Sequence, residues 1–277
     1  MGDMVDIEAA MGYVVAHGDD IDRARLTWLT AGRMPSVDAL ERVESGQTGS
    51  GGWPALSDSR VPSVDATCFR LGEIDDLGAI GRPAARQALA WLASVQQPDG
   101  RWEEDPSIAA QAPSWAQPGD PEAGLYLTAR AAFWLAVSGP PPGATPAWGT
   151  SVEPNDHVDA VRLAAEAFTA SLGPEGSWPS YLATGWFGGA LLYHLGLYYE
   201  SAQVQVALTD RVPEMSASDA AALGAAMGRV GMSAEDWLLT AVRRRLGQTQ
   251  RTDGGWDSDD GPAFDVHATL TAIRTLR

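Results

Sequence analysis

The sequence predicts an all-α protein built from repeated helix pairs. Two observations support this fold class. One spacing of Gln, Gly and Trp recurs along the 277-residue chain, and an apolar pattern of helical period precedes each copy. The chain carries 11 tryptophans, and those in the repeats mark where each helix pair turns. No stretch of the sequence separates two independent cores, so we predict a single domain over residues 1–277.

The repeat is defined by the spacing Gln-x3-Gly-x-Trp. It occurs three times, at residues 47–53, 96–102 and 250–256. A fourth copy, residues 172–178, keeps the Gly and the Trp but has Leu172 where the others have Gln. Such agreement is very improbable by chance, so the repeat is the main guide to the fold.

The copy that contains Gln96 shows why these residue types suit a helix end. A helical apolar pattern at residues 88–95 precedes it, which places Gln96 in or near the last turn. Gly100 permits the left-handed backbone that ends a helix. The Gln amide can satisfy an orphan carbonyl or peptide N–H, and the indole of Trp102 can cover the helix end. We therefore interpret the Gln and the Trp as structural staples.

The remaining elements follow from the repeat. We expect the second helix of each pair at residues 63–71, 125–137, 185–197 and 265–276, a degenerate pair near 218–227 and 234–246, and N-terminal helices near 4–16 and 22–29. Two insertions, residues 103–124 and 138–156, are too long to be plain connectors. We interpret them as lids or rim loops, with partner contacts and disorder as the alternatives.

Composition limits the function classes. The formal net charge of −17 would repel phosphate backbones, so we expect no nucleic-acid partner. All 19 basic residues are arginines, a good phosphate ligand, so a diphosphate substrate stays open. The single cysteine, Cys68, cannot form an internal disulfide. Neither a signal peptide nor a transmembrane run is predicted, which leaves a cytoplasmic protein with no indication of membrane-surface contact.

The repeat spacing resembles the QW motif of squalene-hopene and oxidosqualene cyclases. A looser form occurs in protein prenyltransferase β-subunits and class II diterpene cyclases. The resemblance covers about Pro35 to the C-terminus. It implies an α/α barrel of helix pairs, a toroid whose apolar cavity holds an isoprenoid chain.

The same resemblance implies a catalytic acid. In these cyclases a D-x-D-D motif follows a GGW turn at the start of a helix, and its central Asp protonates an alkene or epoxide. Here residues 51–53 read GGW and residues 62–67 read PSVDAT, which keeps the central Asp as Asp65 but has Ser63 and Ala66 at the flanking acids. An Asp at a helix start is also a common cap, and the helix dipole favours its charged form. Asp65 is therefore predicted as general acid, with the capping role left open.

Two further sites are weaker. Residues 257–260 match D-x-D-D but lie directly after Trp256, so we predict a solvated acidic turn there, with a proton or metal role as the alternative. His267 resembles in position the zinc histidine of prenyltransferase β-subunits, but the upstream Asp-x-Cys is missing. Protein prenylation is disfavoured for that reason. We predict no metal or other cofactor, with magnesium needed only for a diphosphate substrate.

The predicted substrate-binding side chains could stabilise carbocations through their π-faces, although ordinary core packing is the alternative for each. They are Tyr126, Trp186, Phe187, Tyr193 and Phe264, with His267 beside them. The sequence thus predicts a class II, protonation-initiated isoprenoid cyclase. The alternative is a non-catalytic isoprenoid-binding or accessory barrel. Because related cyclases place their site between two barrels, a homodimer or a second barrel subunit is the expected partner besides the isoprenoid.

Overall fold

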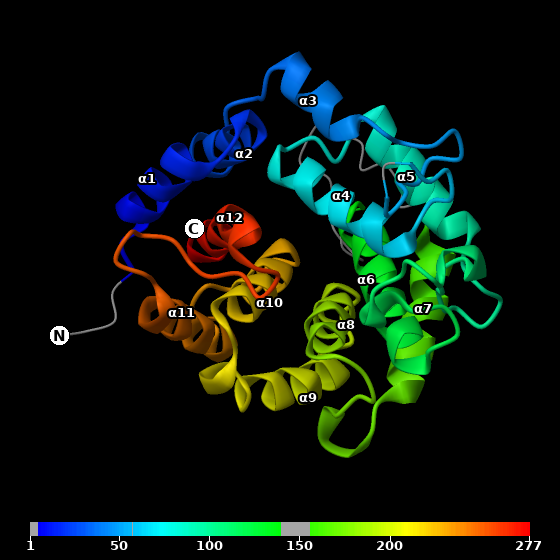
Figure 1. Ribbon diagram of the computed structural model, residues 1–277. Coiled ribbons are helices and arrows are strands. Elements are labelled where there is room, and N and C mark those ends of the chain that lie inside the picture. The colour runs from blue at the N-terminus through cyan, green and yellow to red at the C-terminus, as the bar shows by residue number, and fades with distance from the viewer. Residues whose placement is uncertain (1–4, 57, 140–155) are drawn as a thin grey trace, which may run out of the picture. The chain divides into compact units, whose positions relative to one another are not determined.

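The computed structural model describes residues 5–56, 58–139 and 156–277, and the regular secondary structure in these ranges is helical. Within these ranges an isolated bridge between Pro54 and Pro62 is the only β-type pairing. The helices, labelled in Figure 1, are α1 Ile7–His17, α2 Asp20–Ala31, α3 Val37–Glu44, α4 Val64–Asp76, α5 Pro83–Ser94, α6 Pro121–Val137, α7 Val158–Ser171, α8 Leu182–His194, α9 Tyr198–Thr209, α10 Ala217–Arg229, α11 Trp237–Thr249 and α12 Asp265–Leu276. None of these helices is long and apolar enough to cross a membrane.

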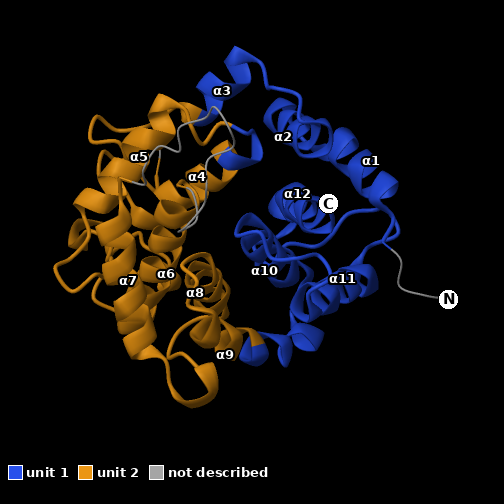
Figure 2. Cartoon of the chain, turned by 180° about the vertical axis from the view of Figure 1, so that it is seen from behind, with its two compact units in different colours: residues 1–43, 75–78, 206–277 blue, residues 44–74, 79–205 orange. Residues whose placement is uncertain are grey.

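The chain divides into two compact units, which Figure 2 colours separately. Unit 1 comprises residues 1–43, 75–78 and 206–277, and unit 2 comprises residues 44–74 and 79–205. In unit 1, α12 packs against α1, α2 and α10, and α10 also packs against α11. In unit 2, α6 packs against α5, α7 and α8. Candidate site residues occur in both units.

The predicted staple of Gln96 is present. Its Nε2 donates to the carbonyl of Gly100 in its own turn, at 3.0 Å, and to the carbonyl of Ala160 at the start of α7, at 2.8 Å. One side chain thus closes a turn and ties it to the next helix of the same type. The same two contacts are made by Gln47 with Gly51 and Ala84, and by Gln250 with Gly254 and Asp6.

The repeat tryptophans connect the turn to the helices before and after it by hydrogen bonds. The Trp102 indole N–H donates to the carbonyl of Leu92 at 2.8 Å, and its main-chain N–H donates to Thr128 Oγ1 at 3.0 Å. Trp256 makes the same pair of bonds, to Leu246 and Thr269. The copy without Gln departs from this pattern, since Trp178 donates instead to the carbonyl of Tyr181.

Glycine is required in these turns for steric as well as conformational reasons. Gly254 has φ of +89°, and a Cβ there would lie 2.4 Å from the carbonyl of Ala9 in α1. Gly100 has φ of +86°, and its Cβ would lie 2.5 Å from the carbonyl oxygen of Leu163 in α7. The Gly254 turn therefore sits directly on the backbone of α1, and the Gly100 turn sits on that of α7.

One helix, α9, is absent from the sequence prediction. The two helices of the predicted degenerate pair, near 218–227 and 234–246, correspond to α10 and α11, which pack against each other. The α9 pattern was missed because Tyr198, Tyr199 and Val206 are exposed, which leaves no clear apolar stripe. The predicted insertion at 138–156 falls almost entirely on residues 140–155, outside the described residues. The other, 103–124, contains two short 3₁₀ turns, Pro106–Ile108 and Ser114–Ala116, and its end from Pro121 onward belongs to α6.

Candidate active site around Asp65

The first turn of α4 is capped by a carboxylate from another part of unit 2. Glu104 accepts hydrogen bonds from Ser63 Oγ at 2.7 Å and from the main-chain N–H groups of Val64 and Asp65, both at 2.9 Å. These N–H groups are the orphan donors of a helix N-terminus. Burial raises the pKa of Glu104, although the three hydrogen bonds oppose that shift. Glu104 performs the capping role that was left open for Asp65.

The Asp65 carboxylate faces three donors from other elements. Arg130 Nη1 forms an ion pair with Oδ1, and the Tyr126 hydroxyl donates to the same oxygen at 3.3 Å. The indole N–H of Trp115 donates to Oδ2 at 3.2 Å. The ion pair is largely sheltered, because the side chains of Arg130 and Asp65 are 13% and 19% exposed. All three donors compensate the negative charge of the carboxylate.

Arg130 connects Asp65 to a group of aromatic rings. Its Nη1 donates to the Tyr126 hydroxyl at 2.7 Å. Its guanidinium carbon lies 5.6 Å from the ring centre of Tyr126 and 5.8 Å from that of Phe187, which is cation–π geometry. Burial disfavours the charge, but Tyr126 and Asp65 together keep the pKa of Arg130 above its usual range. Burial raises the pKa of Tyr126, so its hydroxyl stays a donor.

The rings form what we call the aromatic cluster, consisting of Tyr126, Phe133, Tyr181, Trp186 and Phe187. Phe187 is its centre, with ring centroids 5.3 Å from Phe133, 6.1 Å from Trp186 and 6.4 Å from Tyr126. Tyr181 meets Tyr126 edge to face at 6.2 Å. The indole N–H of Trp186 is buried and has no hydrogen-bond partner among the described residues. The cluster offers π-faces beside a charged pair.

The predicted substrate-binding residues are thus only partly brought together. Tyr126, Trp186 and Phe187 lie in the aromatic cluster with Asp65. Tyr193 lies near the end of α8, where its ring meets that of Tyr198 at 5.4 Å. Phe264, in the 3₁₀ turn before α12, is 45% exposed and belongs to unit 1.

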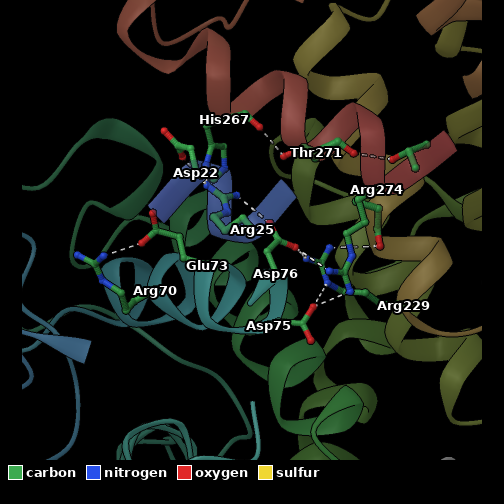
Figure 3. Close-up of polar contacts among 12 residues, drawn as sticks. Asp22, Arg25, Arg70, Glu73, Asp75, Asp76, Arg229, His267, Thr271 and Arg274 are labelled. Atoms are coloured by element: carbon green, nitrogen blue, oxygen red, sulfur yellow. Dashed lines mark hydrogen bonds and ion pairs between the residues drawn. The ribbon is translucent and has the colours of Figure 1, made fainter. Parts of the chain in front are cut away.

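His267 also belongs to unit 1, where it joins a network of charged side chains (Figure 3). Its Nδ1 lies 3.2 Å from Nη1 of Arg25 in α2. Arg25 also donates to Asp76 at 2.7 Å, and Arg229 and Arg274 donate to the same carboxylate at 3.0 and 2.7 Å. Burial would raise the pKa of Asp76, but the three arginines hold it well below its usual range. In this setting His267 is a neighbour of a structural ion-pair network.

The acidic turn at residues 257–260 is solvated, as predicted. Asp257, Asp259 and Asp260 are exposed. Asp257 pairs with Arg251 at 2.6 Å, and Asp259 accepts a hydrogen bond from Ser216 at 2.5 Å. In the described part of the chain, no group of three or more His, Cys, Asp or Glu side chains is arranged to hold a metal ion.

Three residues of this site escaped the sequence reasoning, namely Glu104, Trp115 and Arg130. Arg130 had a readable signal, because it is the only charged residue in the apolar stretch 125–137 and lies four residues after Tyr126 on the same helix face. A lone charge in a buried helix needs a partner. Glu104 and Trp115 lie in the segment 103–124, whose path the sequence pattern does not specify.

The comparisons with known proteins bear on the fold. No family model matches the chain, and no curated protein does. A protein from Actinoplanes matches with a TM-score of 0.62 at 17% identity, over 98% of this chain and 97% of that one. A variant of type II terpene cyclase MstE from Scytonema, in complex with geranylgeranyl dihydroxybenzoate (substrate), matches with a TM-score of 0.61 at 14% identity, over 98% and 95%. A second MstE variant, in complex with merosterolic acid A (product), matches with a TM-score of 0.60 at 15% identity.

The chain has the fold of a type II terpene cyclase. This confirms the predicted class, an all-helical α/α barrel of helix pairs.

Proposed function

We propose that the protein is a protonation-initiated isoprenoid cyclase in which Asp65 is the proton donor. The observation that carries the proposal is that different carboxyl groups cap the start of α4 and face the aromatic cluster. Glu104 caps the helix, so the Asp65 carboxyl is directed to Arg130, Tyr126 and Trp115. An acid for this chemistry must be held at a fixed position beside apolar surface. The fold shared with type II terpene cyclases supports the same assignment.

The proposed step is redox-neutral. The Asp65 carboxyl transfers its proton to one carbon of an alkene, so that an O–H bond and the π-bond break and a C–H bond forms. The neighbouring carbon becomes a tertiary cation, which the next alkene of the polyene attacks. A base then removes a proton from the final cation. No metal is needed for the transfer, and magnesium would be required only for binding a diphosphate head group.

The aromatic cluster is the proposed binding surface for the polyene. Phe187 and Tyr126 present rings next to Asp65, and ring faces stabilise cations by about 0.5–2 kcal/mol each. Trp186 adds its ring to the same surface. Tyr193, Phe264 and His267 remain predicted substrate contacts.

Arg130 holds the Asp65 carboxyl group in place through their ion pair, and its guanidinium also lies against the rings of Tyr126 and Phe187. On this proposal Arg130 is a positioning residue, and Arg130→Gln should form less cyclised product than wild type because the carboxyl group loses its fixed position.

The decisive experiment measures product formation by wild type and variants. Purified protein is incubated with geranylgeranyl diphosphate, squalene and geranylgeranyl dihydroxybenzoate, and products are analysed by gas or liquid chromatography with mass spectrometry. Wild type, Asp65→Asn and Arg130→Gln are compared with Asp159→Asn, a control whose side chain is 94% exposed. We expect cyclised product from wild type and the control and none from Asp65→Asn. Undiminished product from Asp65→Asn would refute the assignment.

A specific observation favours a second candidate, an isoprenoid-binding protein without catalysis. The three donors around Asp65 suit an ion that stays charged. In that case no variant and no pH yields product, while an isoprenoid still changes the fluorescence of Trp186 and Trp115. A second copy or another barrel subunit would then be the catalytic partner, which co-incubation with neighbouring gene products would reveal.

A further inference from the structure

Unit 1 contains a cavity whose walls are rich in arginine. Its volume is about 570 Å³, and it is lined by residues from α2, α10, α11 and α12. Arg229, Arg243, Arg274 and Arg277 are among the lining residues, and none of the lining residues is acidic. In a chain with 36 acidic residues and a net charge of −17, such a surface is unusual.

Two of the arginines are already compensated. Arg229 and Arg274 each bind both Asp75 and Asp76, at distances of 2.7–3.0 Å (Figure 3). Asp75 and Asp76 therefore largely compensate the charges of these two arginines. Arg229 and Arg274 contribute N–H donors to the cavity wall but little uncompensated positive charge.

Arg243 is different. It makes no ion pair within the described residues, and its Nε is buried without a hydrogen-bond partner there. Leaving the buried Nε–H unsatisfied is unfavourable unless something else supplies the acceptor. Among the described residues no carboxylate side chain lines the cavity beside Arg243, and the cavity leaves space for a ligand that supplies the acceptor.

We propose that this cavity binds an organic phosphate or diphosphate, with Arg243 as its principal ligand. The planar guanidinium matches phosphoryl oxygens in a bidentate geometry. The volume exceeds what a phosphoryl group alone occupies, and Trp28, Leu29 and Met232 provide apolar wall for the organic part. This binding site lies wholly within unit 1, shares no residue with the Asp65 cluster, and does not depend on cyclase activity.

Isothermal titration calorimetry on the full chain tests the site. The ligands are inorganic pyrophosphate, geranylgeranyl diphosphate and adenosine diphosphate, which separate the phosphoryl group from two kinds of organic body. The test variant is Arg243→Gln. The control is Arg244→Gln, which changes the same charge on the same helix at an exposed residue. Thermal unfolding without ligand checks that both variants fold, which we expect because Arg243→Gln removes an unsatisfied buried donor.

We expect wild type and Arg244→Gln to bind pyrophosphate, and at least one ester to bind more tightly than pyrophosphate. Arg243→Gln should bind these ligands at least about tenfold more weakly than wild type, since it loses a charge-assisted contact. The ester that binds more tightly identifies the organic body. Absence of binding to wild type would overturn the proposal, as would equal binding by Arg243→Gln and Arg244→Gln. Equal affinity for pyrophosphate and both esters would mean that the cavity recognises only the phosphoryl group. That result would overturn the proposal that the ligand is an organic phosphate.

Discussion

Replacing Asp76 by Asn should destabilise the protein strongly. The Asp76 side chain is 5% exposed and accepts hydrogen bonds from Arg25, Arg229 and Arg274. Arg25 is itself 1% exposed, so it cannot recover its lost partner by hydration. Breaking a buried ion pair by removing one partner costs about 3–5 kcal/mol. For a protein of this size we expect a decrease of about 6–20 °C in the thermal unfolding midpoint.

The loss should depend on pH in a defined direction. The pKa of Asp76 is held well below its usual range in the folded protein, because the three arginines outweigh the effect of burial. Asp76 therefore contributes stability that is fully present above its unfolded pKa of about 3.9 and is lost as the pH falls toward the folded value. The difference in unfolding free energy between wild type and Asp76→Asn should be constant from about pH 5 to 8 and shrink below about pH 4.

Urea unfolding followed by circular dichroism measures both effects. The control is Asp159→Asn, whose partner Arg162 is 3.9 Å away at an exposed position, and which should change the free energy of unfolding by less than about 0.5 kcal/mol. A destabilisation of Asp76→Asn below about 1 kcal/mol at neutral pH would show that the arginines find other partners or solvent. A difference that grows on acidification would contradict the assigned direction of the pKa shift.

Three further predictions concern the repeats and the helix cap. Gly254→Ala should lower the free energy of unfolding by about 2–4 kcal/mol, because its Cβ would lie 2.4 Å from the Ala9 backbone at a φ that disfavours alanine. Gly261→Ala is the control, since Gly261 has φ of +97° but open space around it. In the same denaturation assay it should show only the backbone part of the loss. Gln96→Met should destabilise by about 1–3 kcal/mol by removing two hydrogen bonds to carbonyls, whereas Met at the homologous Leu172 should have little effect. Burial raises the pKa of Glu104, so the contribution of Glu104 to stability declines as the pH rises above its unfolded pKa of about 4.3. Glu104→Gln should flatten that decline. An unchanged pH profile of urea unfolding in this variant would contradict the prediction.

The repeats could be predicted because their determinants are local. Gln96, Gly100 and Trp102 lie within one turn, and each makes its contacts through groups at a fixed sequence distance or on the adjoining helix. The ability to adopt a positive φ belongs to Gly, and the hydrogen-bonding amide belongs to Gln, which lies four residues before that Gly. For this reason the spacing alone indicated helix pairs and their boundaries to within a few residues at most positions.

The Asp65 site could be predicted only in part, because its partners come from distant segments. Sequence position indicated Asp65 and three rings of the aromatic cluster, those of Tyr126, Trp186 and Phe187. It could not indicate that Glu104, 39 residues away, would cap α4, or that Trp115, 50 residues away, would reach Asp65. Both contacts depend on the path of an irregular segment, to which no periodicity applies. The contact between His267 and Arg25 could not be predicted for the same reason, since it joins residues 242 positions apart.

The missing acids of the D-x-D-D pattern acquire a physical explanation from this arrangement. Ser63 stands where the first Asp is expected, and it donates to Glu104 while accepting from the N–H of Ala66. The second carboxylate is thus supplied by another segment, and the charge of Asp65 adds to burial in raising the pKa of Glu104. Arg130 acts in the opposite direction by binding Asp65. The two neighbouring carboxyl groups therefore differ in environment, with Glu104 buried on a helix N-terminus and Asp65 held by an arginine beside π-faces. The residue that binds Asp65 therefore lies outside the motif, on α6, which is why the motif alone does not describe the surroundings of this carboxyl group.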